Sequence, residues 1–271
     1  MFSSKQLYEG TWRIRTAAGV ICYLLEGEER AFLIDTGLGV GSLRAYVESL
    51  TDKPVTVLLT HGHMDHAMGA PEFDEVYMNP LEEEIYDWQC DPRLRIRVTE
   101  RFMAQDHAVW GEHMIPSQPL RYKPLLPGMR FELGKRTLEI YDGGGHTRGS
   151  ICILIPEDRV LILGDACERN TMLLIKYSLT VREYRERMRA LEAATRGRYD
   201  TCWFFHGHGE DRAGYVESIL EVCDLVLRGE DAAIPYRYFN DELLLALPRD
   251  EHLRRLDGGL ADLAYAKGKE K

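Results

Sequence analysis

The 271-residue sequence lacks the features that mark membrane, secreted and multidomain proteins. No apolar run approaches the ~20 residues that a membrane-spanning helix needs, and the first residues show no apolar stretch typical of a secretory signal. No Pro/Ser-rich linker and no internal repeat divides the chain. The sequence therefore predicts one domain over residues 1–271, without membrane contact.

The sequence also lacks any paired spacing among its six cysteines. Disulfide frameworks use such spacings, so none is expected. Several of the cysteines lie inside apolar runs, where cysteine behaves as a small buried hydrophobe. Reduced cysteines of this kind are typical of the cytoplasm, which is therefore the expected location.

A basic surface pattern is missing as well. The formal net charge is -10, whereas a nucleic-acid channel needs a basic stripe. The nearest candidate, residues 182–187, interleaves arginine with glutamate and is typical of a solvated helix face, with Thr180 and Glu183 as its capping box. We therefore expect a small-molecule substrate and no nucleic-acid partner, and leave a homodimer open.

Residues 60–69 are the most informative segment that is present. Three histidines and an aspartate fall within six positions, directly after an apolar, β-branched run that predicts a buried strand. Imidazole and carboxylate are ligands for Zn²⁺ and similar metals. His61 and His63 share a face of an extended chain, whereas Asp65 and His66 follow a turn. The spacing suggests two metals.

Further donors follow other predicted strands, each beside glycine. The apolar runs are residues 138–142, 159–163 and 201–205, and they lead to His146, to Asp165, and to His206 and His208, respectively. Glycine lets the backbone turn sharply and approach a ligand closely. Four strand ends with donors in one chain predict a shared metal site.

In this order, the motifs resemble those of the metallo-β-lactamase-fold superfamily. The matching pieces are residues 33–37, 60–66, 145–147, 164–165 and 207–209. The resemblance implies an α/β fold of the four-layer αββα sandwich type, with a dinuclear metal site at one edge of the sheets. Residues 79–128 would form a helical and loop insertion, and residues 229–271 a C-terminal arm.

The resemblance also implies which side chains bind metal. The ligands would be His61, His63 and His146 for one cation, Asp65, His66 and His208 for the other, and Asp165 between the two. His206 is the alternative to His208, which is favoured because the family's ligand commonly lies between two glycines. Asp35 is not expected to ligate; it would brace nearby backbone or a ligand, or serve as a plain turn residue.

Such a site implies a metal-dependent hydrolase. Two divalent cations, most simply Zn²⁺ with iron or manganese as alternatives, would activate a bridging hydroxide. Asp65 and Asp165 are the expected catalytic carboxylates. True β-lactamases of the superfamily generally lack the shared aspartate, so a small ester-like substrate, a lactone or thioester, is favoured. The alternatives are a phosphodiesterase for small phosphodiesters, a mononuclear iron persulfide dioxygenase, and a metal-binding protein without turnover.

Two segments are candidates for the substrate pocket or for packing. Residues 79–128 begin with a helix start at Asn79 and are rich in large side chains, which favours a substrate wall over extra packing or a dimer contact. A helix is expected over residues 213–227 and another helical piece from Asp241 onward. The aromatic residues 235–239 between them either reach the rim of the site or pack the C-terminal arm.

Overall fold

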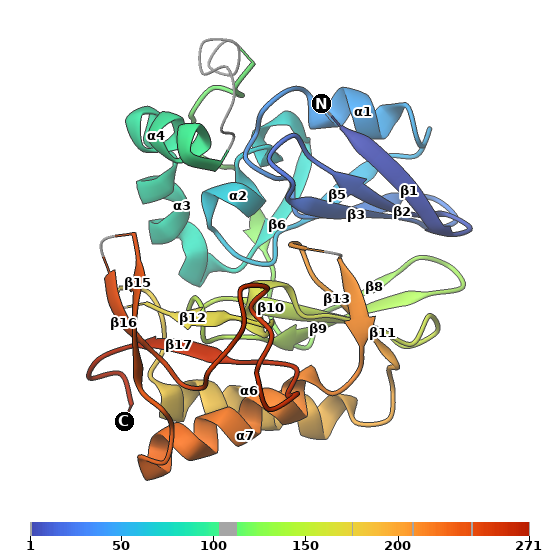
Figure 1. The fold of residues 1–271 in the computed structure, drawn as a ribbon. Coiled ribbons are helices and arrows are strands. Elements are labelled where there is room, and N and C mark those ends of the chain that lie inside the picture. The colour runs from blue at the N-terminus through green and yellow to red at the C-terminus, as the bar shows by residue number, and fades with distance from the viewer. Residues whose placement is uncertain (1, 103–112, 175, 208, 240, 271) are drawn as a thin grey trace. The chain divides into compact units, whose positions relative to one another are not determined.

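The computed structural model describes residues 2–102, 113–174, 176–207, 209–239 and 241–270 (Figure 1). The chain forms two compact units, each with its own core. The first comprises Met1–Leu126, Arg130–Leu138 and Phe205–Gly209, and the second comprises Pro127–Met129, Glu139–Phe204 and Glu210–Lys271. The single domain expected over residues 1–271 stays a prediction.

The first unit contains a sheet in which the strands β1 to β7 are neighbours in chain order. They are β1 (Ser3–Tyr8), β2 (Thr11–Arg15), β3 (Ile21–Glu26), β4 (Ala31–Ile34), β5 (Val55–Leu58), β6 (Glu75–Met78) and β7 (Lys123–Pro124); β8 (Arg130–Glu132) also belongs to this unit. Strands β1 to β4 pair antiparallel, whereas β4 and β5 are parallel, with Ile34 opposite Leu58. Because parallel strands end at the same edge, Asp35 and the histidine-rich segment follow adjacent strand ends.

Short helices cover one face of this sheet. They are α1 (Leu43–Glu48), α2 (Met64–Ala67), η1 (Ala70–Glu72), η2 (Pro80–Glu82), α3 (Glu83–Gln89) and α4 (Pro92–Phe102). Leu33 and Val57 from the strands share a buried core with Val47 of α1 and Met64 of α2. The helix start predicted at Asn79 is confirmed, because its side chain accepts a hydrogen bond from the Leu81 N–H.

The second unit contains two sheets. In the larger one, β14 (Glu210–Arg212), β13 (Thr201–Trp203), β11 (Val160–Ile162), β10 (Ile151–Ile155) and β9 (Thr137–Asp142) follow in that order. The smaller sheet has the order β12 (Thr171–Leu173), β17 (Leu263–Ala266), β16 (Asp241–Leu245) and β15 (Ile234–Tyr238). The strands predicted before His146, Asp165 and His206 are thus β9, β11 and β13.

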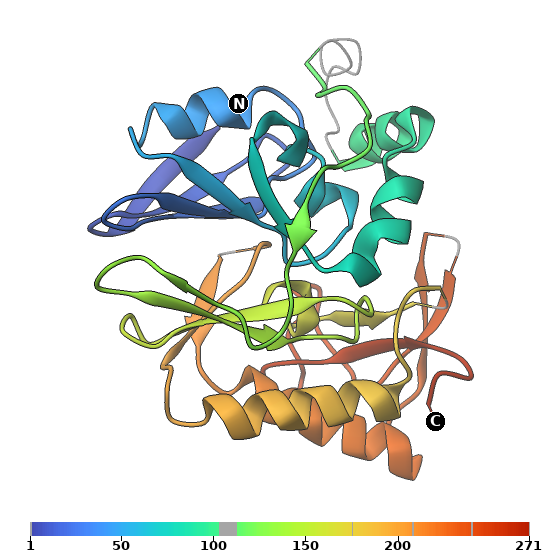
Figure 2. The ribbon, with the colours of Figure 1, turned by 180° about the vertical axis from the view of Figure 1, so that it is seen from behind.

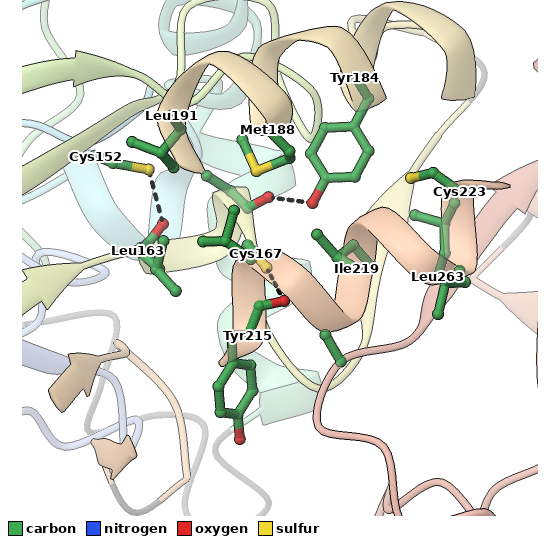
Figure 3. Close-up of a cluster of buried hydrophobic side chains, with 14 of the residues drawn as sticks. Cys152, Leu163, Cys167, Tyr184, Met188, Leu191, Tyr215, Ile219, Cys223 and Leu263 are labelled. Atoms are coloured by element: carbon green, nitrogen blue, oxygen red, sulfur yellow. Dashed lines mark hydrogen bonds between the residues drawn. The ribbon is translucent and has the colours of Figure 1, made fainter. Parts of the chain in front are cut away.

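Two long helices, α6 (Val181–Thr195) and α7 (Tyr215–Arg228), lie side by side in this unit (Figure 2). Tyr184 and Met188 of α6 and Ile219 of α7 pack with Leu163 and Leu263 in one buried cluster (Figure 3). The capping box predicted for α6 is confirmed, with reciprocal hydrogen bonds between Thr180 and Glu183.

The helical piece expected from Asp241 onward was wrong. Residues Asp241–Leu245 form β16, and the later segment Leu263–Ala266 forms β17. The run of three leucines at 243–245 allows either period, because both faces of a buried strand can be apolar. The small sheet provides those two apolar faces, so strand pairing overrides helix propensity there.

All six cysteines are unpaired thiols, and five of them are buried. Desolvation raises the pKa of several of these thiols, among them Cys22 and Cys167, so they are unreactive packing residues. Across the described residues, no helix is both long enough and apolar enough to cross a bilayer.

Asp262, just before β17, should make stability depend on pH. Its side chain is buried, and burial raises its pKa to about 6, against the smaller effects of its bond from the Leu263 N–H and of Arg249 and Arg255. A raised carboxyl pKa disfavours the folded state above pH 6, and that cost decreases as the pH falls toward 4. Asp262→Asn removes this cost. The free energy of unfolding of the variant minus that of the parent should therefore be about 1 kcal/mol larger at pH 8 than at pH 5. Urea unfolding at both pH values measures this difference, and an equal effect at both would contradict it.

Candidate metal centre

His61 and His63 follow β5 and direct two ring nitrogens toward one another. The Nε2 atom of His61 lies 3.0 Å from Nδ1 of His63. Two nitrogens bound to the same zinc at about 2.1 Å lie roughly 3.0–3.4 Å apart, so this spacing fits a shared cation. Thr60 Oγ1 lies 3.1 Å from Nδ1 of His61 and donates its own proton to Asp35. His61 Nδ1 must then carry the proton, which leaves the Nε2 lone pair for a metal.

Asp35 connects this loop to helix α2. Its carboxylate accepts hydrogen bonds from the Thr60 N–H and hydroxyl, both at 2.7 Å, and from Nδ1 of His66, also at 2.7 Å. Asp35 is fully buried; burial raises its pKa, while His66 and Thr60 act in the opposite direction. The expectation that Asp35 braces nearby backbone is confirmed by its bond from the Thr60 N–H, and Asp35 also holds the ring of His66, which stays a predicted ligand. Its bond fixes the proton on Nδ1 of His66 and leaves Nε2 as the donor atom.

Asp65, His66 and His206 form a second group of donors within the first unit. Oδ2 of Asp65 lies 3.6 Å from Nε2 of His66 and 3.7 Å from Nε2 of His206. All three donor atoms lie within 4.8 Å of one another, a set that can hold a cation. His206, the alternative in the sequence analysis, thus lies at this group. His208 lies outside the described residues, so its assignment stays a prediction.

Helix α3 supports the histidine-rich loop from beneath. Oε2 of the buried Glu82, just before α3, accepts the Gly62 N–H at 2.8 Å, and Oε1 of Gln89 accepts the Met64 N–H at 2.6 Å. A Cβ atom at Gly62 would lie 2.7 Å from the Glu82 carbonyl oxygen, so only glycine fits between the two histidines. The sequence gives no signal for either support, because polar residues at the ends of short helices are ordinarily solvated.

The second unit positions His146 and Asp165. Nδ1 of His146 lies 2.8 Å from the Met172 carbonyl oxygen, which accepts its proton, and the Ser178 hydroxyl donates to the His146 carbonyl at 2.6 Å. Nε2 of His146 therefore carries the lone pair, 3.8 Å from Oδ2 of Asp165. The imidazole and the carboxylate predicted to share a cation are neighbours within this unit.

Tyr184 of α6 supports both of these turns. Its hydroxyl donates to the Ala166 carbonyl at 2.7 Å, next to Asp165. A Cβ atom at Gly145 would lie 2.1 Å from the ring, so glycine is required for the ring to lie against the turn that precedes His146. Packing on one side chain therefore couples the positions of the two donors.

The donor chemistry fits divalent metal ions. His61, His66 and His146 each have a hydrogen-bond partner that holds the proton on Nδ1 and leaves Nε2 available. The first unit brings together His61 with His63, and Asp65 with His66 and His206; the second brings His146 to Asp165. Neutral imidazoles oriented by second partners, together with carboxylates, are typical of zinc sites.

Comparison with known proteins gives several matches. Two curated relatives are named acyl-coenzyme A thioesterase MBLAC2. The one from Gallus gallus is 28% identical over 169 residues, 56% of this chain and 58% of the relative. The one from Homo sapiens is 29% identical over 164 residues, 53% and 56%, respectively. The chain thus spans a little over half the length of these relatives.

Solved structures share the fold at low identity. A metallo-beta-lactamase family protein from Thermus thermophilus has a TM-score of 0.57 at 21% identity and covers 82% of each chain. The sec-alkylsulfatase Pisa1 from Pseudomonas sp. has a TM-score of 0.64 at 15% identity, over 84% of this chain and 42% of its own. The model of the metallo-beta-lactamase superfamily matches residues 15–257. The chain therefore belongs to the metallo-beta-lactamase superfamily, and its fold is of the α/β class that the motifs predicted.

Proposed function

We propose that this protein is a dinuclear metal-dependent hydrolase that cleaves an acyl thioester. The observation that carries the proposal is the set of three imidazoles whose Nδ1 protons are held by Thr60, Asp35 and the Met172 carbonyl. Superfamily membership supports metal-dependent hydrolysis, and the names of the curated relatives support a thioester.

The proposed ligand sets join donors from both units. One cation would bind His61, His63 and His146; the other would bind Asp65, His66 and either His206 or His208; Asp165 would serve both. The union of the two sets is inferred from the order of the superfamily's motifs along the chain. Zn²⁺ is the proposed metal because imidazole and carboxylate suit it, with iron or manganese as alternatives.

When bound, a pair of such cations supplies hydroxide at neutral pH and polarises the carbonyl of the substrate. The chain's own part is to hold the donors in place and to offset the positive charge. Asp35 and the Met172 carbonyl keep the imidazoles of His66 and His146 in the ligating tautomer. The carboxylates of Asp65 and Asp165 bring negative charge beside these rings.

A thioester suits a site of this composition. The thiol that leaves has a pKa of about 8.5, so it departs as thiolate near neutral pH without needing a proton donor. An alcohol leaving from an ester has a far higher pKa and gains more from a general acid. The side chains that the two units position are imidazoles and carboxylates that can bind metal. Such a site suits attack on a carbonyl whose leaving group departs without a proton.

Metal analysis combined with a substrate panel tests the proposal. The purified protein should contain close to two zinc ions per chain and hydrolyse acyl-coenzyme A thioesters, and a chelator should abolish activity until zinc is restored. The panel includes an acyl-homoserine lactone, bis-p-nitrophenyl phosphate and a persulfide with oxygen monitoring. Turnover that survives metal removal, or turnover of the phosphodiester alone, would overturn the thioesterase proposal. Bound iron with oxygen uptake would favour the dioxygenase.

A further inference from the structure

The turn that carries His146 is held by β12 and by the loop that follows it. The Met172 carbonyl of β12 accepts the Nδ1 proton of His146. Further along the loop, the Ser178 hydroxyl donates to the His146 carbonyl at 2.6 Å, and the Leu179 N–H donates to the Gly145 carbonyl at 2.9 Å. The imidazole and the main chain of the turn are thus held from separate points, and the main-chain bonds depend on where residues 178–179 lie.

Ser178 is the central residue of this support. It is 2% exposed, and its hydroxyl accepts the Leu174 N–H at 2.8 Å. Accepting that bond directs the single hydroxyl proton toward the His146 carbonyl. Because Ser178 bonds to the residue that carries the ring, a shift of its main chain would move His146 from its position against the Met172 carbonyl.

The segment after β17 reaches the same loop. β12 and β17 are parallel neighbours, with Leu173 opposite Tyr265, so the segments that follow them leave the sheet at the same edge (Figure 1). A turn then brings the chain back, closed by the bond from the Lys269 N–H to the Ala266 carbonyl at 3.0 Å. Lys269 therefore lies beside the loop that supports His146.

Lys269 bonds to the main chain on both sides of the cap of α6. Its Nζ donates to the Ser178 carbonyl at 2.6 Å, and its own carbonyl accepts the Val181 N–H at 2.7 Å. Val181 is the first residue of α6, so its N–H has no partner within the helix. Lys269 thus fixes the main chain before and after Thr180, and with it the position of Ser178.

The electrostatic surroundings alone do not favour a lysine at this position. The start of a helix carries partial positive charge, so a cation beside the first turn of α6 is unfavourable. Burial lowers the pKa of Lys269, and Arg148 lowers it further, whereas Glu183 raises it. The bond to the Ser178 carbonyl and the attraction of Glu183 offset these costs, and only the bond positions the loop.

We propose that Lys269 is a positioning residue for His146 and acts through Ser178. This inference rests on the proposed function, because it takes His146 to bind metal. Lys269 holds the Ser178 carbonyl, the Ser178 hydroxyl holds the His146 carbonyl, and the ring stays against the Met172 carbonyl with Nε2 left for the cation. The segment after β17 thereby affects metal affinity, although Lys269 lies two hydrogen bonds away from His146.

Zinc affinity in a set of lysine variants tests this role. Lys269→Met keeps an apolar stem but removes the donor, and should weaken zinc binding about 3- to 10-fold, less than loss of a direct partner of a ligand. Lys269→Arg keeps the charge and a donor and should recover most of the affinity. Lys267→Met is the matched control, because Lys267 is an exposed lysine of the same segment, and it should bind zinc like the parent. Competition with a chromogenic chelator measures each affinity.

Ser178→Ala shows whether Lys269 acts through Ser178. This variant removes the hydroxyl bond to the His146 carbonyl, so it should weaken zinc binding by itself. Adding Lys269→Met should then cost clearly less than it costs in the parent, because both changes release the same support. Independent, additive losses would overturn the proposal. So would unchanged affinity in Lys269→Met, an equal loss in Lys267→Met, or no recovery in Lys269→Arg.

Hydrogen exchange in the metal-free protein separates this inference from the proposed function. Lys269→Met should speed exchange in residues 143–150 and 176–181 and leave β10 unchanged, whereas Lys267→Met should change none of them. A parent that binds no zinc would refute the proposed metal centre, and exchange would still decide the positioning role. Unchanged exchange in both segments, or faster exchange in β10 as well, would overturn that role, because the second result indicates a loss of global stability.

Discussion

Asp165→Ala is expected to lower kcat/KM for an acyl thioester by about a thousandfold or more. The carboxylate lies 3.8 Å from Nε2 of His146, and in the proposed centre it offsets the charge of both cations. Without it the cations repel one another with less compensation, so metal content should fall from two toward one per chain. Steady-state kinetics and metal analysis on the same preparation measure both effects.

The control for this variant is Glu186→Ala, an exposed acidic residue on α6. It removes the same charge from the same unit and should keep full metal content and activity. Circular dichroism verifies that Asp165→Ala is folded. A folded variant with two bound metals and undiminished turnover would refute the role assigned to Asp165.

Asp35→Asn is expected to have the second largest effect, through the tautomer of His66. The carboxylate now accepts three hydrogen bonds, from the Thr60 N–H and hydroxyl and from Nδ1 of His66. An amide accepts at one end only and donates at the other, which favours the proton on Nε2 of His66. That tautomer cannot ligate through Nε2, so metal affinity should fall about 10- to 100-fold.

The readout is zinc affinity measured by competition with a chromogenic chelator. Asp52→Asn serves as matched control, because Asp52 is an exposed aspartate of the same unit. Thermal unfolding in the presence of chelator separates a metal effect from a folding effect. Unchanged zinc affinity in Asp35→Asn would show that the bond to His66 does not orient the ligand.

Most of the site's local geometry was predictable because it depends on strand ends. A β-branched run followed by a donor beside glycine places that donor at a sheet edge, and the structure has the predicted strands β5, β9 and β11 ahead of these donors. This rule needs only the period of a strand and the turning freedom of glycine. Periodicity and capping signals likewise located α6 and the start of η2.

The supports of the site were less predictable because they depend on distant packing. Glu82 and Gln89 look like solvated helix residues until α3 lies under the loop, where they accept the Gly62 and Met64 N–H groups. Similarly, the run at 243–245 has no single period, and only pairing with β15 and β17 makes it a strand. Neighbours remote in sequence decide such features.

The two units orient their imidazoles by different means, and this affects how the protein tolerates mutation. His66 depends on a side chain, Asp35, whereas His146 depends on the main-chain oxygen of Met172. A substitution can remove a carboxylate side chain but cannot remove a peptide carbonyl. Substitutions at Asp35 should therefore remove the group that orients His66, whereas substitutions at Met172 should leave the carbonyl that orients His146 in place. The orientation of His66 is thus more sensitive to mutation of its partner than the orientation of His146.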